Sequence, residues 1–255
     1  MNTGPRDWDA ETYDRVSDPQ FSWGLEVLER LELEGEETVL DAGAGSGRVT
    51  AELLKRLPRG RVIALDASPS MLEKARESLG DDRVSYVQRD LAELALDEPV
   101  DVVFSTATFH WVADHDNLFT RVHSVLRPGG RLHAQCGGAG NVAEHARVIG
   151  EVGSREPFAK HFAELPVLWN FATAEDTEAR LRNAGLEPTR VWLEHKPLSP
   201  PEPREFMRTV TLGPHLAHLP EKLRDDFVDA IAERMGDPVT LDYVRLNIEA
   251  RRPRT

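Results

Sequence analysis

The sequence predicts an α/β protein built on a seven-stranded, mostly parallel sheet, with helices on both faces and helical cap insertions. Three observations predict this fold. Between residues 37 and 140, short apolar runs alternate with amphipathic helical segments. A glycine-rich turn joins the first of these runs to the first helix. Two further strand-like segments follow, at about 187–195 and 239–250. Apolar runs separated by helices are typical of a parallel sheet that is buried on both faces.

The first 36 residues predict a helical cap segment ahead of the sheet. Their apolar residues recur at helical or near-helical spacing, which is the pattern of an amphipathic helix. The residues that carry this pattern are Trp8, Tyr13, Val16, Phe21, Leu25, Leu28 and Leu31.

Residues 37–140 predict the α/β core of the protein. The expected strands are the apolar runs at 38–40, 61–65, 84–88, 100–104 and 131–135. The expected helices between them lie at about 47–56, 69–79 and 114–126. A short apolar run can also be a buried helix, but Gly60 and Asp66 flank the second run and favour a strand there.

The C-terminal half, 141–255, is expected to complete the sheet and to carry the cap insertions. Four small residues at 137–140 predict a flexible joint. Thr173 and Gly185 are typical of the start and the end of a helix over 173–184. We expect the stretches 141–172 and 199–236 to be cap insertions on one sheet.

Composition restricts the class of protein. The formal net charge is −13, which would repel a phosphate backbone, so nucleic acid is disfavoured as a partner. No apolar run approaches the roughly 18 residues that span a bilayer, and the first residues lack the layout of a signal peptide. The single cysteine, Cys136, excludes an intrachain disulfide. We therefore expect a cytoplasmic protein, and the sequence makes no prediction of its oligomeric state.

The strongest motif is the run VLDAGAGSG at 39–47, between an expected strand and an expected helix. Glycine lets the backbone turn sharply and lets a ligand approach the main chain, and the amides that open the next helix form a polar cradle. Asp66 ends the next strand, about 20 residues further on, where a carboxylate can accept hydrogen bonds from two ribose hydroxyls. The pattern predicts a nucleoside cofactor at the carboxyl edge of the sheet.

Three residues around the glycines indicate which cofactor binds. A dinucleotide fingerprint would have its third glycine at position 48, and a Walker loop would have lysine there, but the sequence has Arg48 followed by Val49. Asp41, expected at the lip of the site, would repel a pyrophosphate but suits a cofactor that carries an ammonium and a sulfonium group. This favours S-adenosylmethionine (SAM). NAD(P), or a glycine turn without a ligand, is the alternative.

With these motifs in view, the run from Val39 to Gly130 resembles the class I SAM-dependent methyltransferases, in the branch of trans-aconitate 2-methyltransferase and juvenile-hormone-acid methyltransferase. The resemblance implies a Rossmann-like seven-stranded sheet and a methyltransferase that acts on a small molecule. The flanks, 1–36 and 137–255, resemble this branch only loosely. The matching motifs are 40–47, 66–71, 88–91, 105–111 and 126–130.

The resemblance also implies the cofactor contacts. Gly43, Ala44 and Gly45 line the methionine moiety, Asp66 binds the ribose, Ala67 and Met71 flank the adenine, Asp90 and the Leu91 amide face the adenine amine, and Thr106 lies beneath the cofactor. Two of these residues have simpler interpretations. Asp90 could be only a helix N-cap, and Met71 could be helix core as well as an adenine contact.

The segment after the fourth strand bears on the methyl acceptor. It lacks the Asp/Asn-Pro-Pro-aromatic sequence of enzymes that methylate base or glutamine nitrogens. Carboxyl methyltransferases that this chain resembles have a His-Trp pair here and a glutamine in the N-terminal helix, which implies His110, Trp111 and Gln20 as catalytic residues. A glutamine amide and an indole N–H can donate hydrogen bonds to a carboxylate.

We therefore expect O-methylation of a small carboxylic acid, which is ionised at neutral pH and needs no general base. A hydroxyl acceptor would need one, and His110 would then be the base. A carbon acceptor, or a SAM-binding protein without methyl transfer, are further alternatives. His110 could also be structural, Trp111 a core aromatic residue and Gln20 an ordinary helix-surface residue.

Other side chains are left with open roles. Aromatic residues of the insertions could form a pocket wall or pack the insertions onto the sheet: Phe158, Phe162, Trp169 and Phe206. Candidates for a second carboxylate of the substrate are Arg155, Lys160 and Arg208. No metal-ligand spacing links His115, His145 and His161, which we expect to be solvated or capping residues. Cys136 is expected to be inert core.

Overall fold

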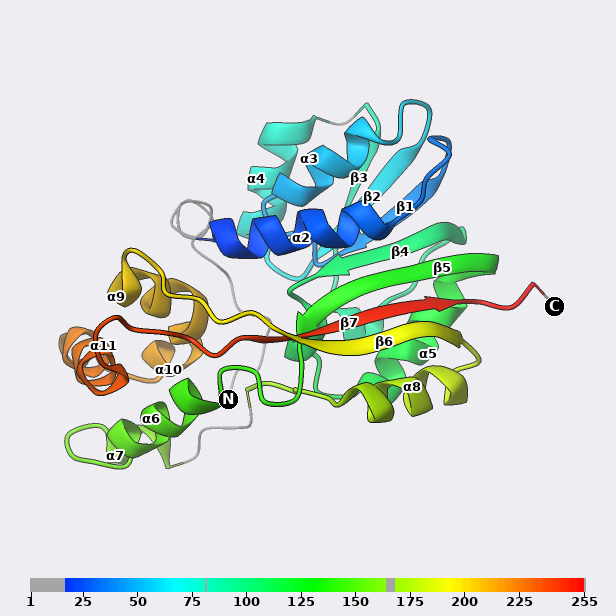
Figure 1. The fold of residues 1–255 in the computed structure, drawn as a ribbon. Helices are drawn as coiled ribbons and strands as arrows, with labels where there is room; N and C mark the ends of the chain where they lie inside the picture. Colours follow the sequence, from blue (N-terminus) through cyan, green and yellow to red (C-terminus); the bar gives the residue numbers. More distant parts are fainter. Residues whose placement is uncertain (1–16, 81, 164–167, 255) are drawn as a thin grey trace.

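Seven strands form one sheet in the order β3-β2-β1-β4-β5-β7-β6 in the computed structural model, which describes residues 17–80, 82–163 and 168–254. The first five strands pair in parallel, and β7 pairs antiparallel with both β5 and β6 (Figure 1). The expected seven-stranded, mostly parallel sheet is confirmed. The strands are β1 Thr38–Ala42, β2 Arg61–Asp66, β3 Val84–Gln88, β4 Val100–Thr106, β5 Leu126–Gly137, β6 Glu187–His195 and β7 Val244–Arg251.

The helices of the core lie close to their expected positions. They are α2 Asp18–Arg30, α3 Arg48–Lys55, α4 Pro69–Leu79, α5 His115–Val125 and α8 Ala174–Asn183, with short 3-10 turns η1 Leu91–Glu93 and η2 Phe109–Trp111. The Thr173 side chain accepts a hydrogen bond from the Asp176 N–H and so begins α8 as expected. The part of the N-terminal helical segment that involves Trp8, Tyr13 and Val16 lies outside the described residues.

Two strands begin well away from their predicted starts. β7 begins at Val244 and not near 239, because the residues before it form an isolated bridge in which Leu198 and Leu241 exchange backbone hydrogen bonds of 2.9 and 2.8 Å. β5 begins at Leu126, five residues before the expected start, because Leu126 already pairs with Val100 ahead of a register shift. Both differences arise from pairing with distant strands.

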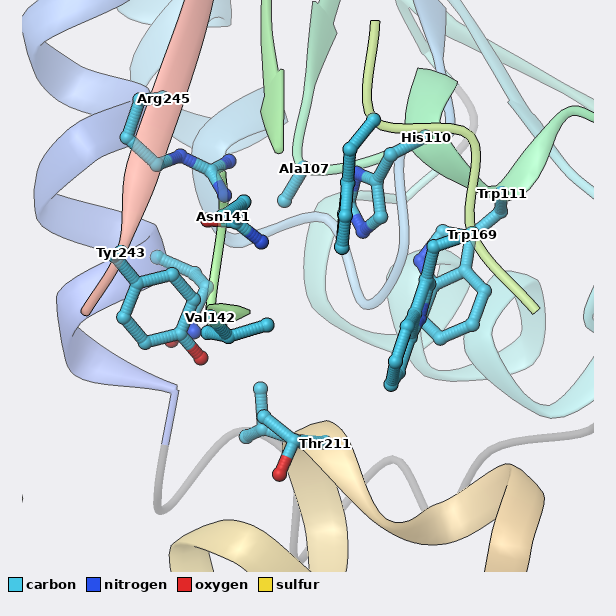
Figure 2. A pocket seen from close by; sticks show the side chains of 12 residues that line it. Ala107, His110, Trp111, Asn141, Val142, Trp169, Thr211, Tyr243 and Arg245 are labelled. Carbon is cyan, nitrogen blue, oxygen red and sulfur yellow. The ribbon is translucent and has the colours of Figure 1, made fainter. Parts of the chain in front are cut away.

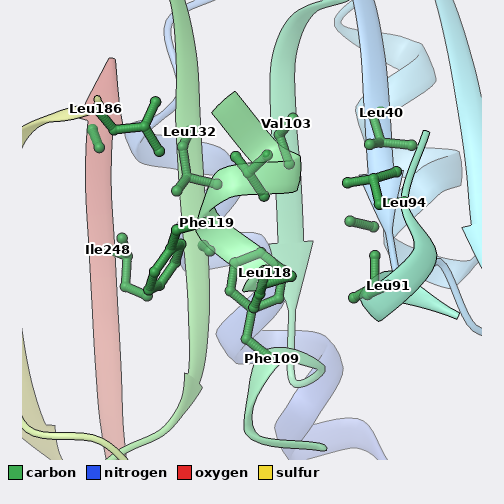
Figure 3. Close-up of a cluster of buried hydrophobic side chains, with 14 of the residues drawn as sticks. Leu40, Leu91, Leu94, Val103, Phe109, Leu118, Phe119, Leu132, Leu186 and Ile248 are labelled. Carbon is green, nitrogen blue, oxygen red and sulfur yellow. The ribbon is translucent and has the colours of Figure 1, made fainter. Parts of the chain in front are cut away.

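Alternate side chains of the central strands enter two separate cores. Leu40 of β1 and Val103 of β4 join one cluster with Phe119 of α5, and Figure 3 shows these side chains packed together. The neighbouring residues, Val39 and Val102, pack on the opposite face against α2 and α3. Burial on both faces explains why the strands are continuously apolar.

The cap region consists of the remaining helices and has its own hydrophobic core. Its helices are α6 Ala143–Gly153, α7 Ala159–Phe162, α9 Pro203–Phe206, the π-helix η3 Met207–Thr211, α10 Gly213–Ala217 and α11 Glu221–Met235. Within the expected insertion at 199–236, residues 203–217 form three short helical pieces. Figure 1 shows the cap region beyond one end of the sheet. It is the end where β5 leads into α6, which is the carboxyl edge of the parallel strands.

A small junction cluster joins the cap region to the sheet. It packs Trp23 of α2 against Tyr243, with ring centroids 5.0 Å apart, and includes Val142 and Phe206. The cap region is therefore held above the carboxyl edge, where open α/β sheets bind ligands. Among the described helices, none is long and apolar enough to cross a membrane.

Candidate active site

The glycine loop, residues 43–47, turns sharply at the end of β1. Gly43, Gly45 and Gly47 have φ values of 87°, 55° and 85°, which is the left-handed region that glycine adopts without steric cost. The Gly43 and Ala44 N–H groups both donate to the Leu65 carbonyl, at 2.7 and 3.0 Å. The loop is thereby fastened over the end of β2.

The three glycines leave room for different neighbours. A side chain at Gly43 would clash with Thr108, the residue that precedes η2. A Cβ at Gly47 would lie 2.8 Å from the Leu79 side chain of α4. At Gly45 a Cβ would meet no atom within 4 Å. Gly43 and Gly47 thus allow close packing within the protein, and Gly45 is the glycine of the three that faces open space.

Asp66 lies beside this open position. Its Oδ2 accepts a hydrogen bond from the Gly45 N–H and its Oδ1 accepts one from the Ser68 N–H, both at 2.9 Å. Burial raises the pKa of this carboxyl group. Each carboxylate oxygen can accept more than one hydrogen bond, so Asp66 can accept further donors at the carboxyl end of β2.

Asp41 is buried beneath the glycine loop and does not lie at the lip of the site, where the sequence analysis expected it. Its side chain is only 2% exposed and accepts a hydrogen bond of 2.6 Å from the Thr50 hydroxyl of α3. Burial is the main cause that raises the pKa of Asp41 to about 7; the Thr50 hydrogen bond opposes this rise, and the nearby Asp66 contributes to it. The expected position at the lip is not observed, because β1 is a central strand whose last residues lie under the loop. A direct contact of Asp41 with the cofactor remains a prediction.

The expected adenine contacts lie after β2 and β3. Asp90 is exposed and caps η1, since its Oδ1 accepts a hydrogen bond of 2.8 Å from the Ala92 N–H. Leu91 is buried in the same cluster as Leu40 and appears in Figure 3. Met71 is buried in α4, and Ala67 is half-buried just before that helix. The capping role of Asp90 and the core role of Met71 are thus present, and their adenine contacts stay predictions.

Helix α2 lies directly on the end of β4. A Cβ at Gly24 would be 2.8 Å from the Val49 side chain and 3.5 Å from Thr106 Oγ1, so the absence of a side chain permits this close approach. One turn earlier, Gln20 is 8% exposed, and its Oε1 atom accepts no hydrogen bond from the described residues. Gln20 is therefore a buried residue at the edge of the sheet and not an ordinary helix-surface glutamine.

A pocket, here called the aromatic pocket, opens at this edge of the sheet. It brings together all three residues that the sequence indicated as catalytic, although they come from α2 and η2 (Figure 2). Glycine-loop residues are not among its described lining residues. Those lining residues are Gln20, Ala107, His110, Trp111, Asn141, Val142, Trp169, Phe171, Val210, Thr211, Tyr243 and Arg245.

Backbone strain coincides with the aromatic pocket. In the described part of the chain, Ala107 and Val142 are the non-glycine residues with positive φ, at 56° and 47°. Both line the pocket. Such conformations cost on the order of 1–3 kcal/mol each and gather at functional sites. The strain is a reason, independent of the sequence motifs, to treat this pocket as the candidate site.

His110 is held as a neutral hydrogen-bond donor. Its Nδ1 accepts a hydrogen bond of 3.2 Å from the Gly137 N–H. Burial, and then the charge of Arg245, hold the pKa of His110 well below its usual value. A neutral imidazole with an acceptor at Nδ1 carries its proton on Nε2. The free ring position is thus an N–H group.

Three aromatic rings form one wall of the pocket. Trp169 and Phe171 stack with centroids 5.6 Å apart, and Trp169 lies 6.1 Å from Trp111. The segment that carries Trp169 and Phe171, just before α8, is hydrogen-bonded to η2, because the Asn170 N–H donates to the His110 carbonyl at 2.8 Å. Trp111 and Trp169 are therefore wall residues. In contrast, Phe158 and Phe162 pack in the core of the cap region, and Phe206 belongs to the junction cluster.

Arg245 is the residue that sequence reasoning missed. It lines the pocket, is 3% exposed, and its guanidinium lies 5.0 Å from the Trp23 ring. The candidates that the sequence offered do not line the pocket, and Arg208 instead pairs with Asp225 of α11. A signal was present, since Arg245 and Asn247 alternate with apolar residues in β7. Alternation of this kind predicts one polar strand face.

The other histidines and the cysteine have structural surroundings. His115 and His145 are buried, and their rings are hydrogen-bonded to the Phe109 carbonyl and the Thr211 hydroxyl, so of the two expected roles, solvated or capping, the solvated one is not observed for either. Cys136 is buried, and burial raises the pKa of its thiol to about 12, as expected for inert core. The described residues contain no group of three or more side chains that could hold a metal ion.

Known proteins share both the sequence and the fold. Residues 39–130 match a family described as methyltransferase domain. The chain is 30% identical over 239 residues to trans-aconitate 2-methyltransferase of Acidovorax sp. (strain JS42), covering 92% of this chain and 91% of that protein.

Solved structures extend the likeness. Phosphoethanolamine N-methyltransferase 2 of Haemonchus contortus, in complex with phosphomonomethylethanolamine and S-adenosylhomocysteine, has a TM-score of 0.63 at 21% identity, over 96% of this chain and 57% of that one. A [4+2]-cyclase has a TM-score of 0.59 at 19% identity, over 99% and 85%. At these identities the likeness shows the fold alone. The family follows from the sequence match over nearly the whole length: this chain belongs to the class I SAM-dependent methyltransferases, in the branch that contains trans-aconitate 2-methyltransferase.

Proposed function

We propose that this methyltransferase transfers the methyl group of SAM to a carboxylate of a small organic acid held in the aromatic pocket. The observation that carries the proposal is the convergence of Gln20, His110 and Trp111 on one strained pocket at the carboxyl edge of the sheet. The name of the Acidovorax relative, trans-aconitate 2-methyltransferase, supports an acid as the acceptor.

The residues beside the pocket fit the cofactor. Gly45 leaves open space that a side chain would reduce, and the half-buried Asp66 carboxylate adjoins it with capacity for two ribose hydroxyls. Gly43, Ala44 and Gly45 would hold the methionine moiety. Ala67, Met71, Asp90 and Leu91 would surround the adenine, and Thr106 would lie beneath. When bound, SAM supplies an electrophilic methyl carbon on a sulfonium.

His110 favours a carboxylate over a hydroxyl acceptor. A general base must present an acceptor atom to the proton that it removes. Nδ1 of His110 is already occupied by the Gly137 N–H, and Nε2 carries the proton. The described lining residues also include no Asp or Glu that could act as the base instead. A carboxylate needs no base, because it is ionised at neutral pH.

The task of the pocket is then alignment. The Gln20 amide, the Trp111 indole N–H and the His110 Nε2–H are neutral donors that would orient one carboxylate oxygen toward the methyl carbon. The aromatic wall excludes water from the reacting atoms. Orientation of this kind contributes up to roughly 7–11 kcal/mol in favourable cases.

The test is a screen with labelled SAM against carboxylic acids, including trans-aconitate, and against phenols. We expect methyl esters from acids. We also expect the rate to vary with pH between 6 and 9 in the same way in the wild type and in His110→Gln, because burial holds the pKa of His110 well below its usual value. His110→Gln, which keeps a donor near the Nε2 position, should retain more activity than His110→Ala. Gln20→Met should lower kcat/KM roughly 10-fold, the effect of one lost hydrogen bond to a charged group.

Two outcomes would contradict the proposal. One is methylation of phenols but not of acids. The other is a rate that rises with pH in the wild type and loses this rise in His110→Ala, which would identify His110 as a base.

A further inference from the structure

We infer that Arg245 binds a second anionic group of the acceptor, distinct from the carboxylate that receives the methyl group. The inference rests on the proposed function and assigns a specificity-determining residue to the same pocket. Figure 2 shows Arg245 beside Asn141 and Tyr243 on one side of the pocket, with His110, Trp111 and Trp169 on the other.

The chemistry of the reaction gives the two sides of the pocket different roles, because the reacting carboxylate should not bind to a cation. As the acceptor oxygen bonds to the methyl carbon, the carboxylate loses its negative charge and becomes a neutral ester. A guanidinium on that carboxylate would stabilise the ground state more than the transition state and so slow the reaction. Neutral donors such as Gln20 and Trp111 orient the group with less of this penalty.

A group that keeps its charge throughout the reaction has no such conflict. Its ion pair with Arg245 is equally strong in the ground state and in the transition state, so it improves binding without raising the barrier. Arginine also suits the task geometrically, since its planar fork matches a carboxylate with two parallel hydrogen bonds. Arg245 is therefore placed to select acceptors that carry an additional anion.

A chain of buried hydrogen bonds orients Arg245. Arg30 of α2 donates to Asn247 Oδ1 at 2.7 Å, and Gln135 Nε2 donates to the same oxygen at 3.0 Å. Gln135 must then turn its Oε1 toward Arg245, whose Nε donates to it at 3.3 Å. Gln135, Arg245 and Asn247 are all buried. We assign Gln135 and Asn247 as positioning residues for Arg245.

The neutral character of Gln135 matters for the charge of the pocket. An amide oxygen orients the guanidinium without cancelling its positive charge, whereas a carboxylate at the same position would form an ion pair with it. The Trp23 ring, whose centroid is 5.0 Å from the guanidinium carbon, supports the side chain by a cation–π contact.

The test measures binding by calorimetry in the presence of S-adenosylhomocysteine. The probes are trans-aconitate, which carries three carboxylates, and crotonate, which carries one. Arg245→Met should weaken trans-aconitate binding roughly 10- to 100-fold, the effect of lost hydrogen bonds between charged groups, and should change crotonate binding much less. Arg251→Met is the matched control, since Arg251 is on the same strand but is exposed and paired with Glu187.

A second variant keeps Arg245 in place. Gln135→Glu retains the acceptor oxygen toward Arg245 but replaces the Nε2 donor to Asn247 and adds a negative charge. It should also weaken trans-aconitate binding at least severalfold, measured at a temperature at which its melting curve shows that it is folded. As a positioning effect, this change should raise KM more than it lowers kcat.

The inference is overturned if Arg245→Met binds trans-aconitate as the wild type does, or if the wild type does not prefer trans-aconitate to crotonate. The proposed function fails by a different result, which is a wild-type protein that methylates no carboxylic acid. A protein that methylates acids equally well with and without Arg245 would leave the proposed function intact and remove only this inference.

Discussion

The glycine loop and the aromatic pocket are adjacent but are built in opposite ways. The loop and its partner Asp66 come from one short stretch of chain, and their contacts are mainly backbone hydrogen bonds. The pocket takes residues from α2, η2, η3 and β7 and from the segments just before η2, α6, α8 and β7. The glycine loop and Asp66, which would bind the shared cofactor, are therefore close together in the sequence. The part that would choose the acceptor is assembled by the fold.

The two regions also differ in strain and in charge. Glycines carry the positive φ angles of the loop, whereas Ala107 and Val142 carry them in the pocket, where they cost more. The loop side contains the acidic residues Asp41 and Asp66, which suit a cationic cofactor. The pocket contains the buried cation Arg245, which suits an anionic acceptor.

The largest expected effect is a loss of cofactor affinity on substitution of Asp66, and it tests whether the loop side is the cofactor site. Asp66→Ala should weaken S-adenosylhomocysteine binding roughly 100-fold or more, because two hydrogen bonds from hydroxyls to a charged group would be lost. Calorimetry measures this, with the exposed Asp97→Ala as control. Unchanged affinity would remove Asp66 from the cofactor site and break the comparison.

A pair of matched substitutions sharpens the division within the loop. Gly43→Ala should lower the free energy of unfolding by about 2–4 kcal/mol, because a left-handed φ and a clash with Thr108 add together. Gly45→Ala should cost only about 1–2 kcal/mol but should weaken S-adenosylhomocysteine binding. Urea unfolding and calorimetry separate the two effects. If both substitutions lowered the free energy of unfolding equally, the predicted clash of a Gly43 side chain with Thr108 would be wrong.

The smallest expected effect is a change of stability with pH that differs between the cap region and the surroundings of Asp41. Burial lowers the pKa of His145 and of His215, both in the cap region, to about 4. The stability that depends on their neutral forms is present above pH 6.5 and is lost as the pH falls toward 4, by up to about 1.4 kcal/mol per pH unit for each. Asp41, with its pKa raised to about 7, has the opposite sign: its contribution is full below about pH 4 and is lost as the pH rises toward 7.

Hydrogen exchange at pH 7.5 and 5.5, corrected for intrinsic rates, should therefore show α6 and α11 opening more readily at the lower pH. The segment around β1 and α3 should not open more readily. Equal acid sensitivity of both regions would contradict the assignment of these pKa shifts to separate cores.

Sequence reasoning predicted the sheet well wherever the signal was local. β3 and β6 have their expected bounds, and β2 differs by one residue. The three residues expected to act on the acceptor converge on one pocket, which the motif order alone could not demonstrate. The expectations that the structure does not match, such as the position of Asp41 at the lip of the site and the start of β7, depend on which strand lies next to which.

The helices and strands of this protein follow from local sequence patterns, because hydrophobic periodicity, glycine conformation and helix capping act over a few residues. Only the tertiary structure decided that β7 inserts antiparallel between β5 and β6 and carries Arg245 to the carboxyl edge. The packing of Thr108 on Gly43, and the open space beside Gly45, likewise depend on the tertiary structure. These contacts join residues far apart in the chain, and their geometry depends on strand order, register and close packing, which no local pattern encodes.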